Sequence, residues 1–265
     1  MLRALVAAAF LASALASCAP AASIRVAAPT PAAGVATAPL VVLAAADLQY
    51  ALPEIAQLYE AETGRKVTIS LGSTGTFATQ IQNGAPADVF FAADSSFMDD
   101  LEKADLLAEK TRQLYATGRI VVTYAKGAAE ARTLEDLTKP ELKKIAIANP
   151  EHAPYGRAAQ EALQKAGVWD KVQPKLVLGE NIAQTAQLIR TGNADAGIIA
   201  LSVALGQPGT PYALVDASLH EPLAQQVAVL KASKQVDAAK EFIAFVNGPQ
   251  GRPVMKKYGF LLPGE

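Results

Sequence analysis

Short apolar runs alternate with amphipathic segments from residue 40 to the C-terminus. The run Val89–Ala92 is apolar throughout and indicates a buried strand, whereas Lys66–Leu71 alternates apolar with polar residues, as a half-buried strand does. Apolar residues at helical spacing, such as Leu48, Leu52 and Ile55, predict amphipathic helices between the strands. We expect strands at residues 40–43, 66–71, 89–92, 119–124, 144–149, 176–178, 196–201, 212–215 and 226–230.

This order predicts an α/β fold with mixed, mostly parallel sheets flanked by helices. We expect helices after Asp47, after the turn at 72–76, from Ser95, at 157–166, from Ile182, at 236–246 and at 249–258, with short helical turns at 133–142. Two domains are predicted: domain 1 from residues 40–122 plus 226–265, and domain 2 from residues 123–225. Strand-to-helix turns of this kind place ligands at the carboxyl ends of strands.

One such turn, Gly72–Thr76 (GSTGT), stands out because it is small and rich in hydroxyl groups. At a helix start it collects free backbone N–H groups, hydroxyl donors and the positive end of the helix dipole. The turn is therefore a candidate anion site that needs no cationic side chain. The simpler interpretation is an ordinary helix N-cap at Ser73 or Thr74.

The N-terminal segment has the pattern of a targeting signal. Arg3 precedes an apolar stretch that is too short to span a bilayer, and Leu15–Cys18 (LASC) matches a bacterial lipobox. We expect residues 1–18 to be a signal segment with lipidation at Cys18. The alternative is cleavage by ordinary signal peptidase after Ala16. Residues 19–39, rich in Ala and Pro, are expected to be a disordered tether.

Composition excludes several classes of function. The chain has 24 basic and 25 acidic residues, and this balance argues against a nucleic-acid-binding surface. Two histidines and one cysteine leave no basis for a Cys/His zinc site, so His152 beside Glu151 is interpreted as structural. The sequence contains no nucleophile elbow, and no catalysis is expected.

The chain resembles the periplasmic molybdate-binding proteins of ABC transporters over residues 41–262. The segments that carry the resemblance are Ala44–Leu48 (AAADL), Ser73–Thr76 (STGT) with Gln80-Ile81, Gly84–Phe90 (GAPADVF), Asn149–Gly156 (NPEHAPYG), Gly167–Asp170 (GVWD), Gly248–Gln250 (GPQ) and Lys257–Phe260 (KYGF). The resemblance implies the type II periplasmic-binding-protein fold, in which two domains close by a hinge on a ligand cleft between them.

In that family the cleft holds a tetrahedral oxyanion, molybdate or tungstate, by uncharged hydrogen bonds from four loops. The resemblance assigns these contacts to Asp47, to Thr74 with Ser73 beside it, to the hydroxyl of Tyr155 and to the backbone N–H of Ile182. It implies no cofactor and no metal site beyond these molybdate contacts.

The resemblance also implies partners and a location. A protein of this family hands its ion to an ABC permease, with its ATPase, in the inner membrane. We expect a monomer in the periplasm or cell envelope that touches the membrane only through a lipid on Cys18.

Asp47 departs from the family, which usually has serine at this position. A carboxylate beside a dianion is repulsive and lacks the serine donor. Three hypotheses remain open: Asp47 caps its own helix and offers only its N–H, it is protonated and donates, or it accepts from an ion that carries a proton.

Two other functions remain open as well. The same fold could bind another oxyanion or a small organic acid, which an arginine in the cleft, such as Arg119 or Arg157, would support. Alternatively, the chain is an oxyanion-sensing adaptor lipoprotein that contacts a signalling partner.

Overall fold

The computed structural model describes residues 38–265, which belong to one compact unit. The predicted signal segment, the predicted lipidation site Cys18 and nearly all of the predicted tether lie outside the described residues. No helix within residues 38–265 is long and apolar enough to cross a membrane. The predicted α/β class is confirmed, because two mixed five-stranded sheets are each flanked by helices.

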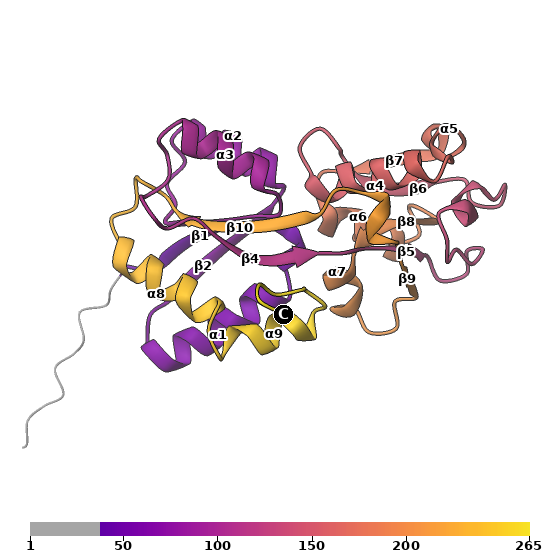
Figure 1. Cartoon of the computed structure of the whole chain (residues 1–265). Helices are drawn as coiled ribbons and strands as arrows, with labels where there is room; N and C mark the ends of the chain where they lie inside the picture. The colour runs from indigo at the N-terminus through magenta and orange to yellow at the C-terminus, as the bar shows by residue number, and fades with distance from the viewer. Residues whose placement is uncertain (1–37) are drawn as a thin grey trace, which may run out of the picture. The chain divides into compact units, whose positions relative to one another are not determined.

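The first sheet has the strand order β2-β1-β3-β10-β4 (Figure 1). Its strands are β1 (Leu40–Ala45), β2 (Val67–Gly72), β3 (Val89–Ala92), β4 (Gln113–Gly118) and β10 (Leu223–Val229). Strand β1 is parallel to β2 and β3, and β10 is antiparallel to β3 and β4. Helices α1 (Ala51–Thr63), α8 (Val236–Val246) and α9 (Gly251–Lys257) pack on one face, and α2 (Thr74–Gln82) and α3 (Ser95–Lys103) pack on the other.

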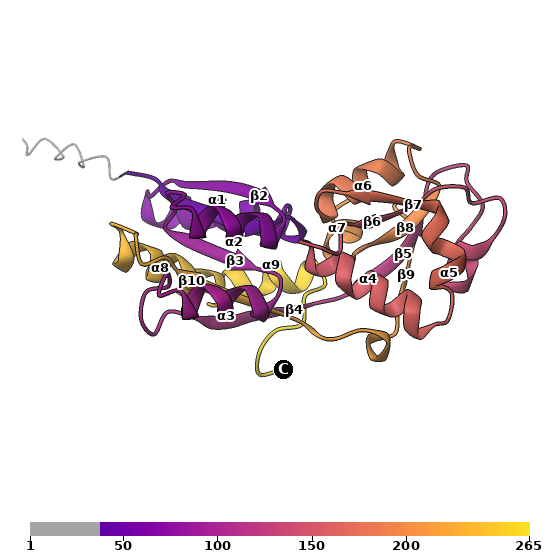
Figure 2. The ribbon, with the colours of Figure 1, turned by 90° about the horizontal axis from the view of Figure 1, so that it is seen from above.

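The second sheet has the order β7-β6-β8-β5-β9 (Figure 2). Its strands are β5 (Ile120–Tyr124), β6 (Ile145–Ala148), β7 (Leu176–Gly179), β8 (Ala196–Ala200) and β9 (Tyr212–Leu214). Strand β6 is parallel to β7 and β8, and β5 is antiparallel to β8 and β9. The flanking helices are α4 (Pro154–Lys165), α5 (Trp169–Val172), α6 (Ile182–Arg190) and α7 (Leu201–Leu205).

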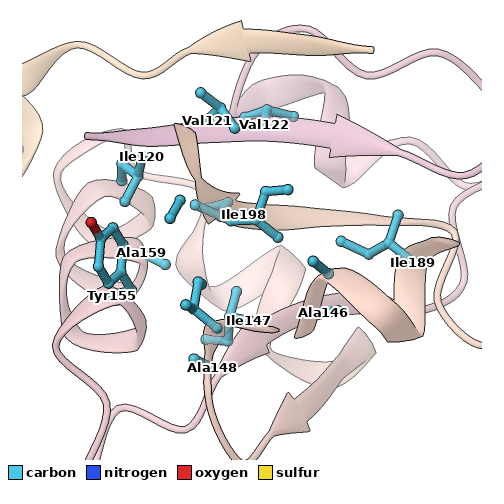
Figure 3. Close-up of a cluster of buried hydrophobic side chains, with 14 of the residues drawn as sticks. Ile120, Val121, Val122, Ala146, Ile147, Ala148, Tyr155, Ala159, Ile189 and Ile198 are labelled. Carbon is cyan, nitrogen blue, oxygen red and sulfur yellow. The ribbon is translucent and has the colours of Figure 1, made fainter. Parts of the chain in front are cut away.

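The core of the second sheet joins its strands to α4 and α6. Figure 3 shows Ile147 of β6 and Ile198 of β8 between Ala159 of α4 and Ile189 of α6. Tyr155, in the first turn of α4, packs its ring at the edge of the same cluster. The core therefore fixes the helix start that carries Tyr155.

The chain passes between the sheets twice, from β4 to β5 and from β9 to β10. The predicted domain limits at 122/123 and 225/226 fall inside β5 and β10, so each passage lies a few residues earlier than expected. The division into two domains stays a prediction. Below, the first half means the first sheet with its helices, and the second half means the second sheet with its helices.

The structure corrects the prediction that Asp47 caps the helix after β1. Residues Ala46–Leu48 form a short 3-10 helix, η1, whose N-cap is Ala45. Helix α1 begins only at Ala51, and its N-cap, Tyr50, makes no side-chain capping bond. Proline has no N–H to donate, and Pro53 in the first turn of α1 suits a helix that starts at this point.

Other expected elements differ in detail. The helical turns expected at 133–142 reduce to one 3-10 helix, η2 (Glu135–Thr138). Helix α3 begins at Ser95, as predicted, and is capped by Asp94, whose side chain accepts from the Ser96 N–H. Strand β4 and helix α7 were not expected from the sequence pattern.

Candidate functional site

A small pocket lies where the carboxyl ends of parallel strands from both sheets meet. Strands β1, β2 and β3 contribute from the first sheet, and the loops after β6 and β7 contribute from the second. The lining residues are Ala45, Ala46, Asp47, Gly72, Ser73, Thr74, Ala93, Ala153, Pro154, Tyr155, Asn181 and Ile182. All five residues that the resemblance assigned to the ligand are therefore brought together.

Three helices of nine or more residues begin at this pocket, and a fourth begins beside it. Ser73, Ala153 and Asn181 are the N-caps of α2, α4 and α6, and Ala93 directly precedes Asp94, the N-cap of α3. Each helix start contributes free N–H groups and a partial positive charge of about +0.5. No lysine, arginine or histidine lines the pocket, so these backbone ends dominate its positive potential.

The two hydroxyl residues at the start of α2 have different partners. Ser73 is buried, and its Oγ donates to the backbone carbonyl of His152 in the second half and lies 3.0 Å from His152 Nδ1. Thr74 is also buried, and its Oγ1 accepts from the N–H of Ala93 at 3.1 Å. The hydroxyl proton of Thr74 is therefore available to a ligand, whereas that of Ser73 is directed toward the second half of the molecule.

The start of α6 places the backbone N–H of Ile182 at the pocket. Asn181 caps this helix, and its Oδ1 accepts from the N–H groups of Ala183 and Gln184, both at 3.0 Å. The cap does not engage the N–H of Ile182, a buried residue that lines the pocket. This N–H can serve a bound anion.

Asp47 is the one acidic side chain that lines the pocket, and it is 1% exposed. Its Oδ2 accepts from the hydroxyl of Tyr155 at 2.9 Å and from Nε2 of Gln225 at 2.7 Å. Gln225 Nε2 also lies 2.9 Å from the Tyr155 hydroxyl oxygen. Asp47 Oδ1 is buried and has no hydrogen-bond partner of normal geometry.

Burial raises the pKa of Asp47 from 3.8 to about 6. The hydrogen bonds from Gln225 and Tyr155, and the nearby N–H groups of Asp47 and Leu48, favour the charged form but only partly oppose this effect. Burial also raises the pKa values of Tyr155 and Tyr115 well above the usual tyrosine range, so both remain neutral.

These contacts correct one expectation about the site, and the ligand role of Tyr155 stays a prediction. The Asp47 carboxylate bonds to Tyr155 and Gln225 and caps no helix, so the hypothesis of a helix cap is wrong. The Tyr155 hydroxyl, assigned to the ligand by resemblance, donates to Asp47 in this structure. Sequence reasoning missed Gln225, although a glutamine that interrupts the apolar pattern of a buried strand is a usable signal.

The arginines and the histidine considered in the sequence analysis do not line the pocket. Arg119 donates to the carbonyl of Gly259, and Arg157 pairs with Asp94 at 2.9 Å across the two halves. His152 Nε2 lies 3.9 Å from a carboxylate oxygen of Glu180. Within residues 38–265, no group of three or more His, Cys, Asp or Glu residues could hold a metal ion.

A family model described as bacterial extracellular solute-binding protein matches residues 40–261. The chain belongs to this family. Among its curated relatives is the molybdate-binding protein ModA of Azotobacter vinelandii, which is 38% identical to this solute-binding protein over 83% of the chain and 88% of the relative. ModA of Rhodobacter capsulatus is 35% identical, over 78% of the chain and 82% of the relative.

Solved structures agree with this family assignment. The periplasmic molybdate-binding protein of Azotobacter vinelandii superimposes on this solute-binding protein with a TM-score of 0.80, at 30% identity, over 84% of the chain and 99% of that protein. The sulfate-binding protein SubI of Mycobacterium tuberculosis has a TM-score of 0.69 at 17% identity, over 86% of the chain and 88% of that protein, and shares the fold.

Proposed function

We propose that this protein captures a tetrahedral oxyanion, molybdate or tungstate, and delivers it to an ABC importer. The observation that carries the proposal is the convergence of three helix N-termini and the Thr74 hydroxyl on a small pocket without a cationic side chain. A tetrahedral dianion has four acceptor oxygens and matches donors that arrive from several directions. The relatives named as molybdate-binding proteins support the same ion.

Neutral donors suit an ion that must be released again. A buried lysine or arginine would bring its own desolvation cost and a strong point charge, whereas N–H groups at helix starts are already desolvated by the fold. The donors sit on helices packed against both sheets, so the pocket cannot contract freely around a smaller ion. We therefore expect molybdate and tungstate to bind more tightly than sulfate.

The pocket gives little support to a small organic acid. Neither Arg119 nor Arg157 lines it, although an arginine was the feature that would have favoured a carboxylate ligand.

We place the protein outside the cytoplasm, as the family description and the sequence-level signal segment suggest. Its partners would be an ABC permease with its ATPase, and Cys18 would carry a lipid anchor. A Bacillus subtilis relative, 33% identical over 83% of this chain, is named a putative ABC transporter substrate-binding lipoprotein, which agrees with both expectations. The bound ion is the cargo, and we propose no catalytic role.

Calorimetric titration of the purified protein with molybdate, tungstate, sulfate and phosphate tests the proposal. We expect one molybdate or tungstate ion per chain, with sulfate at least tenfold weaker. Equal binding of all four anions, or no binding of molybdate and tungstate, would refute the proposed ion. Thr74→Ala serves as the site control, because it removes a pocket hydroxyl.

A further inference from the structure

The pocket contains an acceptor where an anion site is expected to present donors. Asp47 lines the pocket, its Oδ2 already accepts two hydrogen bonds, and its Oδ1 is buried with no hydrogen-bond partner of normal geometry. The negative charges of an ionised Asp47 and of an anion in the same buried pocket repel each other more strongly than they would in water. A fully deprotonated dianion beside an ionised Asp47 is therefore strongly disfavoured.

The surroundings of Asp47 offer no positively charged side chain to relieve this repulsion. The groups that face it are the hydroxyl of Tyr155 from α4, the amide of Gln225 from β10 and the hydroxyl of Tyr115 from β4. Ser202 of α7 donates to the backbone carbonyl of Asp47 at 2.8 Å. No charged group contributes to the titration of Asp47.

We propose that the site binds its oxyanion together with one proton, held between Asp47 Oδ1 and an oxygen of the ion. This inference rests on the proposed function and specifies its chemistry. When a fully deprotonated ion such as molybdate binds, Asp47 takes up one proton from solvent. The protonated Asp47 then donates a hydrogen bond to the ion. An ion that already carries a hydrogen, such as hydrogen phosphate, donates it to an ionised Asp47, and no proton is taken up.

Two further observations agree with this arrangement. Burial raises the pKa of Asp47 to about 6, so protonation costs little near neutral pH, and a bound anion raises this pKa further. Gln225 and Tyr155 both direct donors to Oδ2, and this leaves Oδ1 as the oxygen that can carry the proton.

The test is calorimetry with molybdate at pH 7.5 in two buffers of different ionisation enthalpy, which counts the protons taken up. We expect about one proton per ion, and an affinity that falls about tenfold per pH unit from pH 7 to 9. In Asp47→Asn and Asp47→Ser the uptake should vanish and the affinity should become independent of pH. His152→Gln is the control, because His152 is an ionisable side chain that contacts Ser73 at the start of α2; this variant should retain the proton uptake.

The outcomes separate this inference from the proposed function. Tight, pH-independent molybdate binding by the unmodified protein without proton uptake would overturn the inference and leave the proposed function intact. Binding of hydrogen phosphate or hydrogen arsenate without uptake, together with no binding of molybdate or tungstate, would support the inference and overturn the proposed ion. If none of these anions binds, both fail.

Discussion

Thr74 is the pocket side chain whose hydroxyl proton is available to bind an anion. Its hydroxyl oxygen already accepts from the Ala93 N–H, so its proton is the part that a ligand can use. Loss of a hydrogen bond to a charged ligand costs about 1.5–3 kcal/mol. We therefore expect Thr74→Ala to weaken molybdate binding by about 10- to 100-fold, as measured by calorimetry.

Thr74→Ser keeps the donor and should bind within a few-fold of the unmodified protein. Thr79→Ala, an exposed position on the same helix, is the surface control. Equal affinities for Thr74→Ala and Thr79→Ala would remove Thr74 from the site.

Asp47 makes stability depend on pH in a direction that follows from its raised pKa. The folded-state pKa of about 6 exceeds the ordinary value of 3.8, so the neutral form is favoured on folding and stability is lost as pH rises from about 4 through 6. Asp47→Asn removes this loss. Its free energy of unfolding should match that of the unmodified protein near pH 4 and exceed it by up to about 3 kcal/mol above pH 7.

Urea denaturation of the ligand-free proteins at several pH values measures this difference. Asp170→Asn, at an exposed position, is the control for replacing an aspartate with asparagine. A difference between Asp47→Asn and the unmodified protein that is constant from pH 4 to 8 would contradict the raised pKa.

At the scale of single residues, the sequence located helix starts better than it located side-chain partners. Ser73 and Thr74 follow from local turn and cap chemistry, which depends on near neighbours, whereas Ile182 was assigned by the family resemblance. Gln225 lies 178 positions from Asp47, and no local pattern connects the two. The engagement of Tyr155 with Asp47 was missed for the same reason, because it forms only when the two sheets come together.

The start of α2 also holds the two halves together. The Gly75 N–H donates to the carbonyl of His152 at 2.9 Å, and Ser73 donates to the same carbonyl. A Cβ at Gly75 would lie 2.8 Å from this oxygen and 2.9 Å from the Cβ of His152, which is closer than real Cβ contacts. Glycine is needed at this position so that the helix start can approach the loop before α4.

We expect Gly75→Ala to weaken molybdate affinity at least tenfold, because the methyl group keeps the halves from closing. Alanine is the better helix former by about 0.5–1 kcal/mol, so the ligand-free protein should keep its stability. Calorimetry and thermal melts of the variant give the two quantities. Gln80→Ala, exposed on the same helix, is the control, and unchanged affinity in Gly75→Ala would show that this contact does not support binding.

At the scale of elements, regular patterns were predictable and irregular ones were not. Strands such as β3 and β6 are apolar throughout and buried on both faces, and they were found. Strand β4 was missed because it has no period of two: Tyr115 and Ala116 are both buried, and Leu114 beside them is 40% exposed. The pairing of β4 with β10 shifts register between Gln225 and Gln226. This shift accounts for the break in the alternation of β4.

At the scale of the molecule, the site exists only where the two sheets meet, so ligand binding should stabilise residues 38–265 as a unit. A ligand at 100 times its dissociation constant adds about 2.7 kcal/mol to the free energy of unfolding. For a chain of this size, we expect molybdate at that excess to raise Tm by about 5–10 °C. Calorimetric melts with sulfate at the same concentration are the control, and equal shifts would argue for a nonspecific salt effect.

Anomalous diffraction at the molybdenum edge, from crystals grown with molybdate, tests the central claim most directly. The account predicts a single strong peak in the pocket, with oxygens of the ion within hydrogen-bond distance of Thr74 Oγ1, the Ile182 N–H and Asp47 Oδ1. An empty pocket at saturating molybdate, or a peak confined to another part of the surface, would contradict it.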